Sequence, residues 1–172
     1  GFPIVRSNAV QALDDADSLL SEKGYRPEIV FFDLPGTLKS DGVIKTLSQM
    51  DYIFTPVSAD RFVVESALQF VMMFNDNLVT TGLAKTKDIS LFWTMVDGRE
   101  KTGLYDLYGK LFAENNFRVL DTRLPDSKRF RREPSDDRKS VFRSTILPPD
   151  TSMLKGSRIR ELSEEICSII NG

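Results

Sequence analysis

Residues 29–37 read IVFFDLPGT, and this stretch decides the predicted fold. Four β-branched and aromatic residues lead to Asp33, and a Pro35-Gly36 turn follows almost at once. The pattern is typical of a buried parallel strand that delivers a carboxylate to the carboxyl edge of a sheet. We therefore predict a strand over residues 28–33 with Asp33 at its end.

The rest of the chain alternates between strand and helix patterns. This order predicts an α/β fold in which a mostly parallel sheet has helices on both faces. Further strands are expected at residues 52–57, within DISLFWTMVD at 88–97 and within NFRVLDTRLP at 116–125. Helices are expected at residues 7–23, 40–50, 61–75, 105–115 and 158–170.

The carboxyl ends of parallel strands are where such sheets bind ligands. Four loops should therefore lie together at this edge, at residues 33–36, 56–60, 94–99 and 122–125. Each loop also has a purely structural interpretation, because Pro, Gly and Asp are ordinary turn residues.

Composition limits the classes of protein that the chain can belong to. With 172 residues, 41% hydrophobic and 28% charged, it is expected to form one globular domain over residues 1–172. The formal charge of −2 means that any nucleic-acid surface must be a local patch. No apolar run approaches the roughly 18 residues of a transmembrane helix, and no signal-peptide pattern is present, so we expect a soluble cytoplasmic protein.

Two absences exclude whole kinds of site. The chain has no histidine, which excludes histidine-dependent hydrolase triads and histidine-ligated zinc sites. Its single cysteine, Cys167, lies in an amphipathic terminal pattern and is expected to be a small buried hydrophobe. One copy can form neither a disulfide nor a four-cysteine iron–sulfur cluster.

An acidic strand end like Asp33 normally works with a glycine-rich phosphate loop, which reads Gly-x-x-x-x-Gly-Lys-Ser/Thr. Gly98 and Gly103 have the right separation, but Leu104 and Tyr105 follow where Lys and Ser or Thr are needed. These 172 residues therefore contain no such loop. Either the protein never had one, or the chain begins downstream of it.

Taken in order, IVFFDLPGT, LFWTMVDGR and TRLPDSKRFRREPS resemble segments of the ParA/MinD family of deviant Walker ATPases. That family adopts the phosphate-loop nucleotide hydrolase fold. The resemblance extends from residue 28 to the C-terminus and is greatest to the ParA-like, TraA-type proteins of conjugative transposons. It implies that the first strand and the phosphate loop precede this chain, which is then the C-terminal part of a ParA-like ATPase domain.

The resemblance also implies roles for matched residues in the intact protein. Asp33 would be catalytic and bind a water on Mg²⁺, while Pro35 and Gly36 would bring a backbone N–H towards the γ-phosphate of ATP. The adenine pocket would be lined by Thr94, Met95 and Pro125. Asp97 and Arg99 would hold the loop after Met95 in shape, although Arg99 has the alternative of a solvated surface charge. ATP and Mg²⁺ are thus expected cofactors of the full-length protein, whereas this chain alone should be inactive and need none.

A basic segment follows at residues 128–143. It holds seven basic and three acidic side chains, a local excess of four positive charges in a chain that is net negative. Basic clusters attract phosphate backbones without reading sequence. The candidates for DNA contact are Lys128, Arg129, Arg131, Arg132 and Arg143. The alternative is a charged loop whose basic residues pair with neighbouring acids.

The expected function is that of a ParA-type, ATP-dependent switch in DNA partition or conjugative transfer. Such a protein would be a homodimer when ATP is bound, would bind DNA non-specifically, and would need an unidentified partner protein that stimulates hydrolysis. The alternative is a non-catalytic interaction module that keeps the fold. Membrane binding is not expected, because the terminal helix has three glutamates and no lysine cluster.

Overall fold

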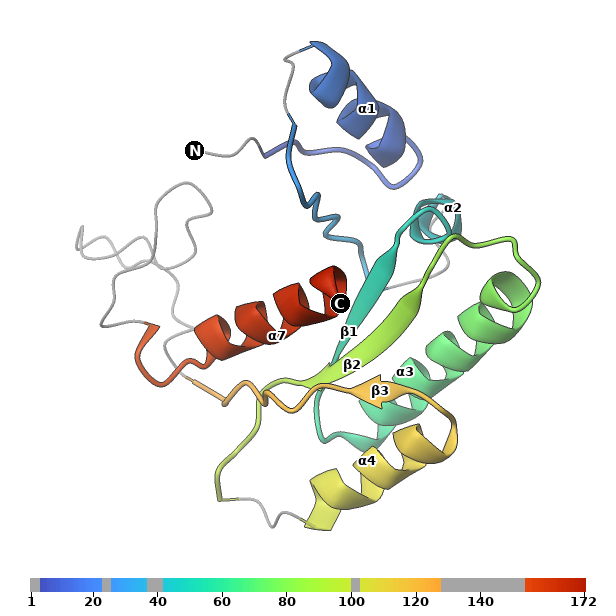
Figure 1. The fold of residues 1–172 in the computed structure, drawn as a ribbon. Coiled ribbons are helices and arrows are strands. Elements are labelled where there is room, and N and C mark those ends of the chain that lie inside the picture. Colours follow the sequence, from blue (N-terminus) through green and yellow to red (C-terminus); the bar gives the residue numbers. More distant parts are fainter. Residues whose placement is uncertain (1–3, 23–25, 37–41, 100–102, 128–153) are drawn as a thin grey trace.

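The computed structural model describes residues 4–22, 26–36, 42–99, 103–127 and 154–172 (Figure 1). Its centre is a three-stranded, all-parallel sheet in the order β1-β2-β3. The strands are β1 (Tyr52–Val57), β2 (Asp88–Trp93) and β3 (Arg118–Val119). The helices are α1 (Ala12–Glu22), α2 (Val43–Leu47), α3 (Arg61–Phe74), the π-helix η1 (Asn75–Val79), α4 (Gly103–Glu114) and α7 (Ile159–Asn171).

The strands pair in the order in which they occur in the chain. Strand β1 runs in register with β2 from Tyr52 opposite Asp88 to Val57 opposite Trp93. Parallel neighbours need a crossover, which α3 provides between β1 and β2, and α4 between β2 and β3. This arrangement places the ends of all three strands at one edge of the sheet.

Alternation along the strands sends one set of side chains towards α3 and α4. On β2, Ile89, Leu91 and Trp93 lie on this face, where they share a buried cluster with Phe74 of α3 and Phe112 of α4. Because these large side chains are shielded from water, their burial is the main source of stability for this part of the fold.

Helix α7 covers the opposite face of the sheet, as Figure 1 shows. Its Leu162 is buried, and the Tyr52 hydroxyl donates to the Ile170 carbonyl over 3.4 Å. The predicted α/β fold with a parallel sheet and helices on both faces is confirmed.

The predicted strand at residues 28–33 is wrong. Residues 26–36 have no regular secondary structure and pair with none of the three strands. Val30 and Phe31 are 46% and 76% exposed. The apolar pattern gives this segment strand propensity, but a strand forms only where a neighbour takes up its backbone N–H and C=O groups.

Other elements differ mainly at their ends. The first helix begins at Ala12 rather than residue 7, because Asn8 accepts hydrogen bonds from the N–H groups of Val10 and Gln11 in a turn. The last strand is two residues long, although its pairing with β2 resumes further on. Cys167 is exposed, which corrects the expected burial: it lies beside, not within, the apolar stripe of α7.

Candidate functional site: the carboxyl edge of the sheet

Three of the four predicted loops lie at the same edge of the sheet. The segments at 56–60, 94–99 and 122–125 follow β1, β2 and β3, which run parallel. The fourth segment, 33–36, does not follow a strand, so its predicted place at this edge has no support from the pairing. The candidate site therefore consists of the loops after β2 and β3, beside the end of β1.

Thr94 and Met95 are fixed directly after β2. The Thr94 backbone N–H donates to the Val57 carbonyl over 2.8 Å, and its hydroxyl donates to the same oxygen over 3.3 Å. Met95 has a left-handed backbone, with φ at 53°, and its side chain is 56% exposed. A left-handed methionine costs roughly 1–2 kcal/mol, so neighbouring bonds must hold it in place.

Those bonds come from the loop after β3. The Leu124 N–H donates to the Trp93 carbonyl over 2.8 Å, and the Val96 N–H donates to the Leu124 carbonyl over 3.0 Å. Val96 then forms a parallel bridge with Pro125. Backbone pairing thus brings together the three residues predicted to line the adenine pocket, Thr94, Met95 and Pro125, while their contact with a base stays a prediction.

Sequence reasoning missed the side chain that holds this loop from the other face. Glu165, on α7, accepts the backbone N–H of Asp121 over 2.6 Å and that of Thr122 over 2.9 Å. Burial is the largest influence on the pKa of Glu165 and would raise it. The bonds from Thr122 and Asp121, with the positive charge of Arg158, outweigh burial and lower the pKa overall.

Two arginines secure the same edge. Arg123 lies over the ring of Tyr105, 5.3 Å from its centroid, and 3.8 Å from a carboxylate oxygen of Asp106. Arg99 forms two side-chain bonds to Asp97, at 3.1 and 2.9 Å, which lower the pKa of the Asp97 carboxyl. Asp97 and Arg99 therefore pair within the loop, while the guanidinium of Arg99 is largely exposed, so both predicted roles of Arg99, a loop contact and a surface charge, stay open.

The residues predicted to bind phosphate, Mg²⁺ and DNA lie outside the joined loops. Asp33, Pro35 and Gly36 are exposed in the irregular segment. No group of three or more acidic or cysteine side chains able to hold a metal occurs in the described parts of the chain. Residues 128–153, and with them all five candidates for DNA contact, lie outside the described residues.

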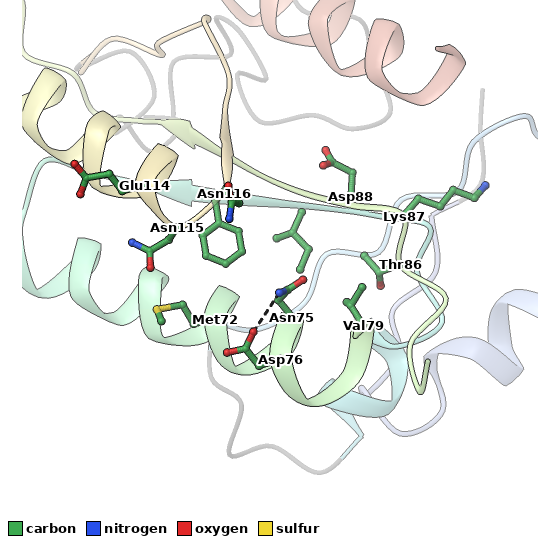
Figure 2. Close-up of a pocket in the computed structure, with 12 residues that line it drawn as sticks. Met72, Asn75, Asp76, Val79, Thr86, Lys87, Asp88, Glu114, Asn115 and Asn116 are labelled. Carbon is green, nitrogen blue, oxygen red and sulfur yellow. Dashed lines mark hydrogen bonds between the residues drawn. The ribbon is translucent and has the colours of Figure 1, made fainter. Parts of the chain in front are cut away.

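A pocket of about 390 Å³ lies at the opposite edge of the sheet, where β2 and β3 begin. Figure 2 shows Asn75 and Asp76 of η1 facing residues 86–88 at the start of β2 and 114–116 at the end of α4. Several of its polar side chains already have partners: the Asn75 amide donates to Asp76 over 3.2 Å, and Asp88 accepts the Ser90 hydroxyl over 2.6 Å. None of the predicted site residues lines it.

Within the described residues, no helix is both long enough and apolar enough to cross a membrane. No protein-family model and no curated protein matches the sequence. A solved structure called "Partition Protein" is similar over 75% of this chain, with 15% identity and a TM-score of 0.46. This chain spans 31% of the length of that protein, and a likeness at this level says nothing of activity or partners.

Proposed function

We propose that this chain carries the base-recognition loops and the switch segment of a ParA-type ATPase that acts in DNA partition or conjugative transfer. The observation that carries the proposal is the joining of the loops after β2 and β3, which places Pro125 beside residues 94–96. Support also comes from the resemblance of IVFFDLPGT, LFWTMVDGR and TRLPDSKRFRREPS to segments of that family.

The chemistry of the three loop residues suits a flat base. An exposed methionine thioether and a proline ring offer apolar surface, and the Thr94 hydroxyl, which donates its proton to the Val57 carbonyl, can still accept a hydrogen bond at the margin. Backbone bonds fix the loops in advance, so little ordering entropy would be lost when a base binds. These residues therefore fit the adenine of ATP.

The described residues do not fit Mg²⁺ or a triphosphate in the same way. Asp33 is a lone exposed carboxylate, and no cluster of acidic side chains accompanies it in the described ranges. We assign the phosphate and metal chemistry to the full-length protein, where Asp33 would act with a phosphate loop. Dimerisation with ATP, non-specific DNA binding and stimulation by a partner protein belong to the same proposal.

Adenosine tests the base site in this chain without requiring a phosphate loop. We expect millimolar adenosine to shift the amide NMR signals of Met95, Val96, Leu124 and Asp126, and uridine to shift them less. Met95→Ala should weaken adenosine binding about fivefold, which corresponds to roughly 1 kcal/mol of lost apolar contact. Leu83→Ala is the matched control, because Leu83 is also exposed but precedes β2 at the other edge.

NMR shifts confined to the pocket of Figure 2 would contradict the proposed base site. So would equal effects of Met95→Ala and Leu83→Ala on adenosine binding. The non-catalytic alternative is tested in the gene. A phosphate-loop motif encoded upstream of Gly1 supports the ATPase, and an initiator methionine near Gly1 supports an interaction module.

A further inference from the structure

The pairing between β2 and β3 is interrupted where the candidate site begins. The Leu120 N–H donates to the Leu91 carbonyl, and an unbroken parallel ladder would next pair the Thr122 N–H with the Trp93 carbonyl. Trp93 instead accepts from Leu124. Residues 121–123 thus lie between the two donors Leu120 and Leu124, whereas only Phe92 lies between the two acceptors on β2. The two extra residues form a bulge.

The bulge takes the Thr122 N–H out of the ladder, and the N–H groups of Asp121 and Thr122 both donate to Glu165. Both oxygens of this one carboxylate are used, at 2.6 and 2.9 Å. Thr122 is buried, so its N–H would be costly to leave unpaired. Bonds from N–H groups to a carboxylate are also stronger than bonds between neutral groups.

We propose that Glu165 is a positioning residue for the base site: it holds the bulge at 121–123 so that pairing resumes at Leu124 and brings Pro125 beside Val96. Its part in base binding rests on the proposed function, but its hold on the backbone does not. Through this carboxylate, helix α7 on one face of the sheet sets the geometry of the loop at its carboxyl edge.

The experiment compares Glu165→Gln with Glu164→Gln in the whole chain. Both variants remove one negative charge from α7, but Glu164 is exposed, whereas Glu165 is half-buried and accepts the N–H groups of Asp121 and Thr122. Glutamine keeps the size of glutamate and has one acceptor oxygen instead of two, so α7 should still fold and pack. Hydrogen exchange of individual backbone amides is measured by NMR.

In Glu165→Gln we expect exchange to become about tenfold faster at Thr122 and also at Leu124, Val96 and Asp126, which lie beyond the bulge. Exchange at Leu120, before the bulge, should stay unchanged. A merely local or general loosening would not produce this division. Adenosine binding should weaken about threefold in Glu165→Gln, and Glu164→Gln should match the wild type in every measurement.

Unchanged exchange at Leu124, Val96 and Asp126 in Glu165→Gln would overturn the proposal, as would acceleration of Leu120 by the same factor. Faster exchange beyond the bulge with unchanged adenosine affinity would overturn the role in base binding. If the wild-type chain binds no adenosine, the proposed function fails, whereas the exchange pattern still decides whether Glu165 positions the loop.

Discussion

The indole of Trp93 meets the ring of Tyr105 edge to face, with ring centroids 5.2 Å apart and planes at 90°. Trp93 is the last residue of β2 and is 1% exposed, and Thr94 of the candidate site follows it directly. On the same side, Phe112 of α4 approaches Trp93 with centroids 6.0 Å apart. The hydrophobic core therefore ends immediately beneath the loops of the candidate site.

The first prediction concerns this support. Phe112→Ala should lower the free energy of unfolding by about 3–5 kcal/mol, because it empties space in a fully buried cluster. The control is Phe62→Ala, whose side chain is 76% exposed and which should change stability by no more than about 0.5 kcal/mol. Fluorescence of the single tryptophan, Trp93, can follow denaturant unfolding. Equal effects of the two variants would contradict the observed packing.

The second prediction concerns Gly42, which has a φ of 87° and lies against the segment before α1. A Cβ at Gly42 would lie 2.6 Å from the Cα of Val10. Gly42→Ala should therefore destabilise the chain by about 2 kcal/mol or more, from backbone strain and from the clash.

Gly109 supplies the matched control, because it lies inside α4 and a Cβ there would have no atom within 4 Å. Gly109→Ala should stabilise the chain by about 0.5–1 kcal/mol. Thermal unfolding of both variants measures the difference. A Gly42→Ala protein as stable as the wild type would show that residues 9–10 do not pack against α2.

Two of the three strands of the sheet could be predicted from the sequence, because each has a local apolar pattern typical of a buried strand. The predicted strand at 52–57 coincides with β1, and DISLFW has the apolar run of a strand buried on both faces. The segment at 28–33 has an equally strong pattern, but propensity does not reveal whether a neighbouring strand is present. The predicted strand at 28–33 is wrong because it lacks a hydrogen-bonded neighbouring strand, and such pairing depends on residues far away in the chain.

The candidate site was predictable only in part, for a related reason. Thr94, Met95 and Pro125 follow strand patterns, so their shared edge could be inferred from a parallel sheet. The bonds from Asp121 and Thr122 to Glu165 join residues more than 40 positions apart and depend on how α7 packs. Helical spacing separates Glu165 from its neighbour Glu164, because Glu165 lies three residues after Leu162 and four before Ile169, beside the apolar stripe. That spacing does not reveal which backbone groups the carboxylate accepts.

The third prediction is the pH dependence of the Glu165 interaction. The folded pKa of Glu165 lies below its ordinary value of 4.5, so its contribution to stability is fully present above that value. It should be lost as the pH falls through the folded pKa. We expect the stability difference between wild type and Glu165→Gln to be largest near pH 7 and to shrink below about pH 4.5.

Denaturant unfolding of both proteins at several pH values measures this difference. Arg158 is the cation that acts on Glu165, and it stays protonated throughout this range, so it adds no titration of its own. A difference that grew as the pH fell would contradict a lowered pKa.

The fourth prediction concerns Asp33 in the full-length protein. Asp33→Ala should cut ATP hydrolysis by orders of magnitude if the carboxylate acts through a magnesium-bound water. Because Asp33 is exposed, the folded state should be little affected, and circular dichroism can check this. Near-normal turnover in a folded variant would remove Asp33 from the site, while loss of folding would indicate a structural role.

The last prediction concerns the basic segment at 128–143, which we propose as the DNA surface of the ATP-bound dimer. Its excess of four positive charges contrasts with the −2 of the whole chain, and charge alone would attract any duplex equally. Changing Arg129, Arg131, Arg132 and Arg143 together to Ala should weaken binding to unrelated duplexes by similar factors. It should also flatten the salt dependence by roughly one unit of slope for each lost phosphate contact.

Binding should be measured with the full-length protein in ATP, because a monomer presents only half of a dimeric surface. Hydrolysis without DNA should persist in the quadruple variant, which separates a DNA contact from damage to the nucleotide site. Lys85→Ala and Lys110→Ala, outside this segment, are controls for the loss of positive charge alone. An unchanged salt slope in the quadruple variant would mean that these arginines do not contact phosphates, and the segment would then be a charged loop paired with its neighbouring acids.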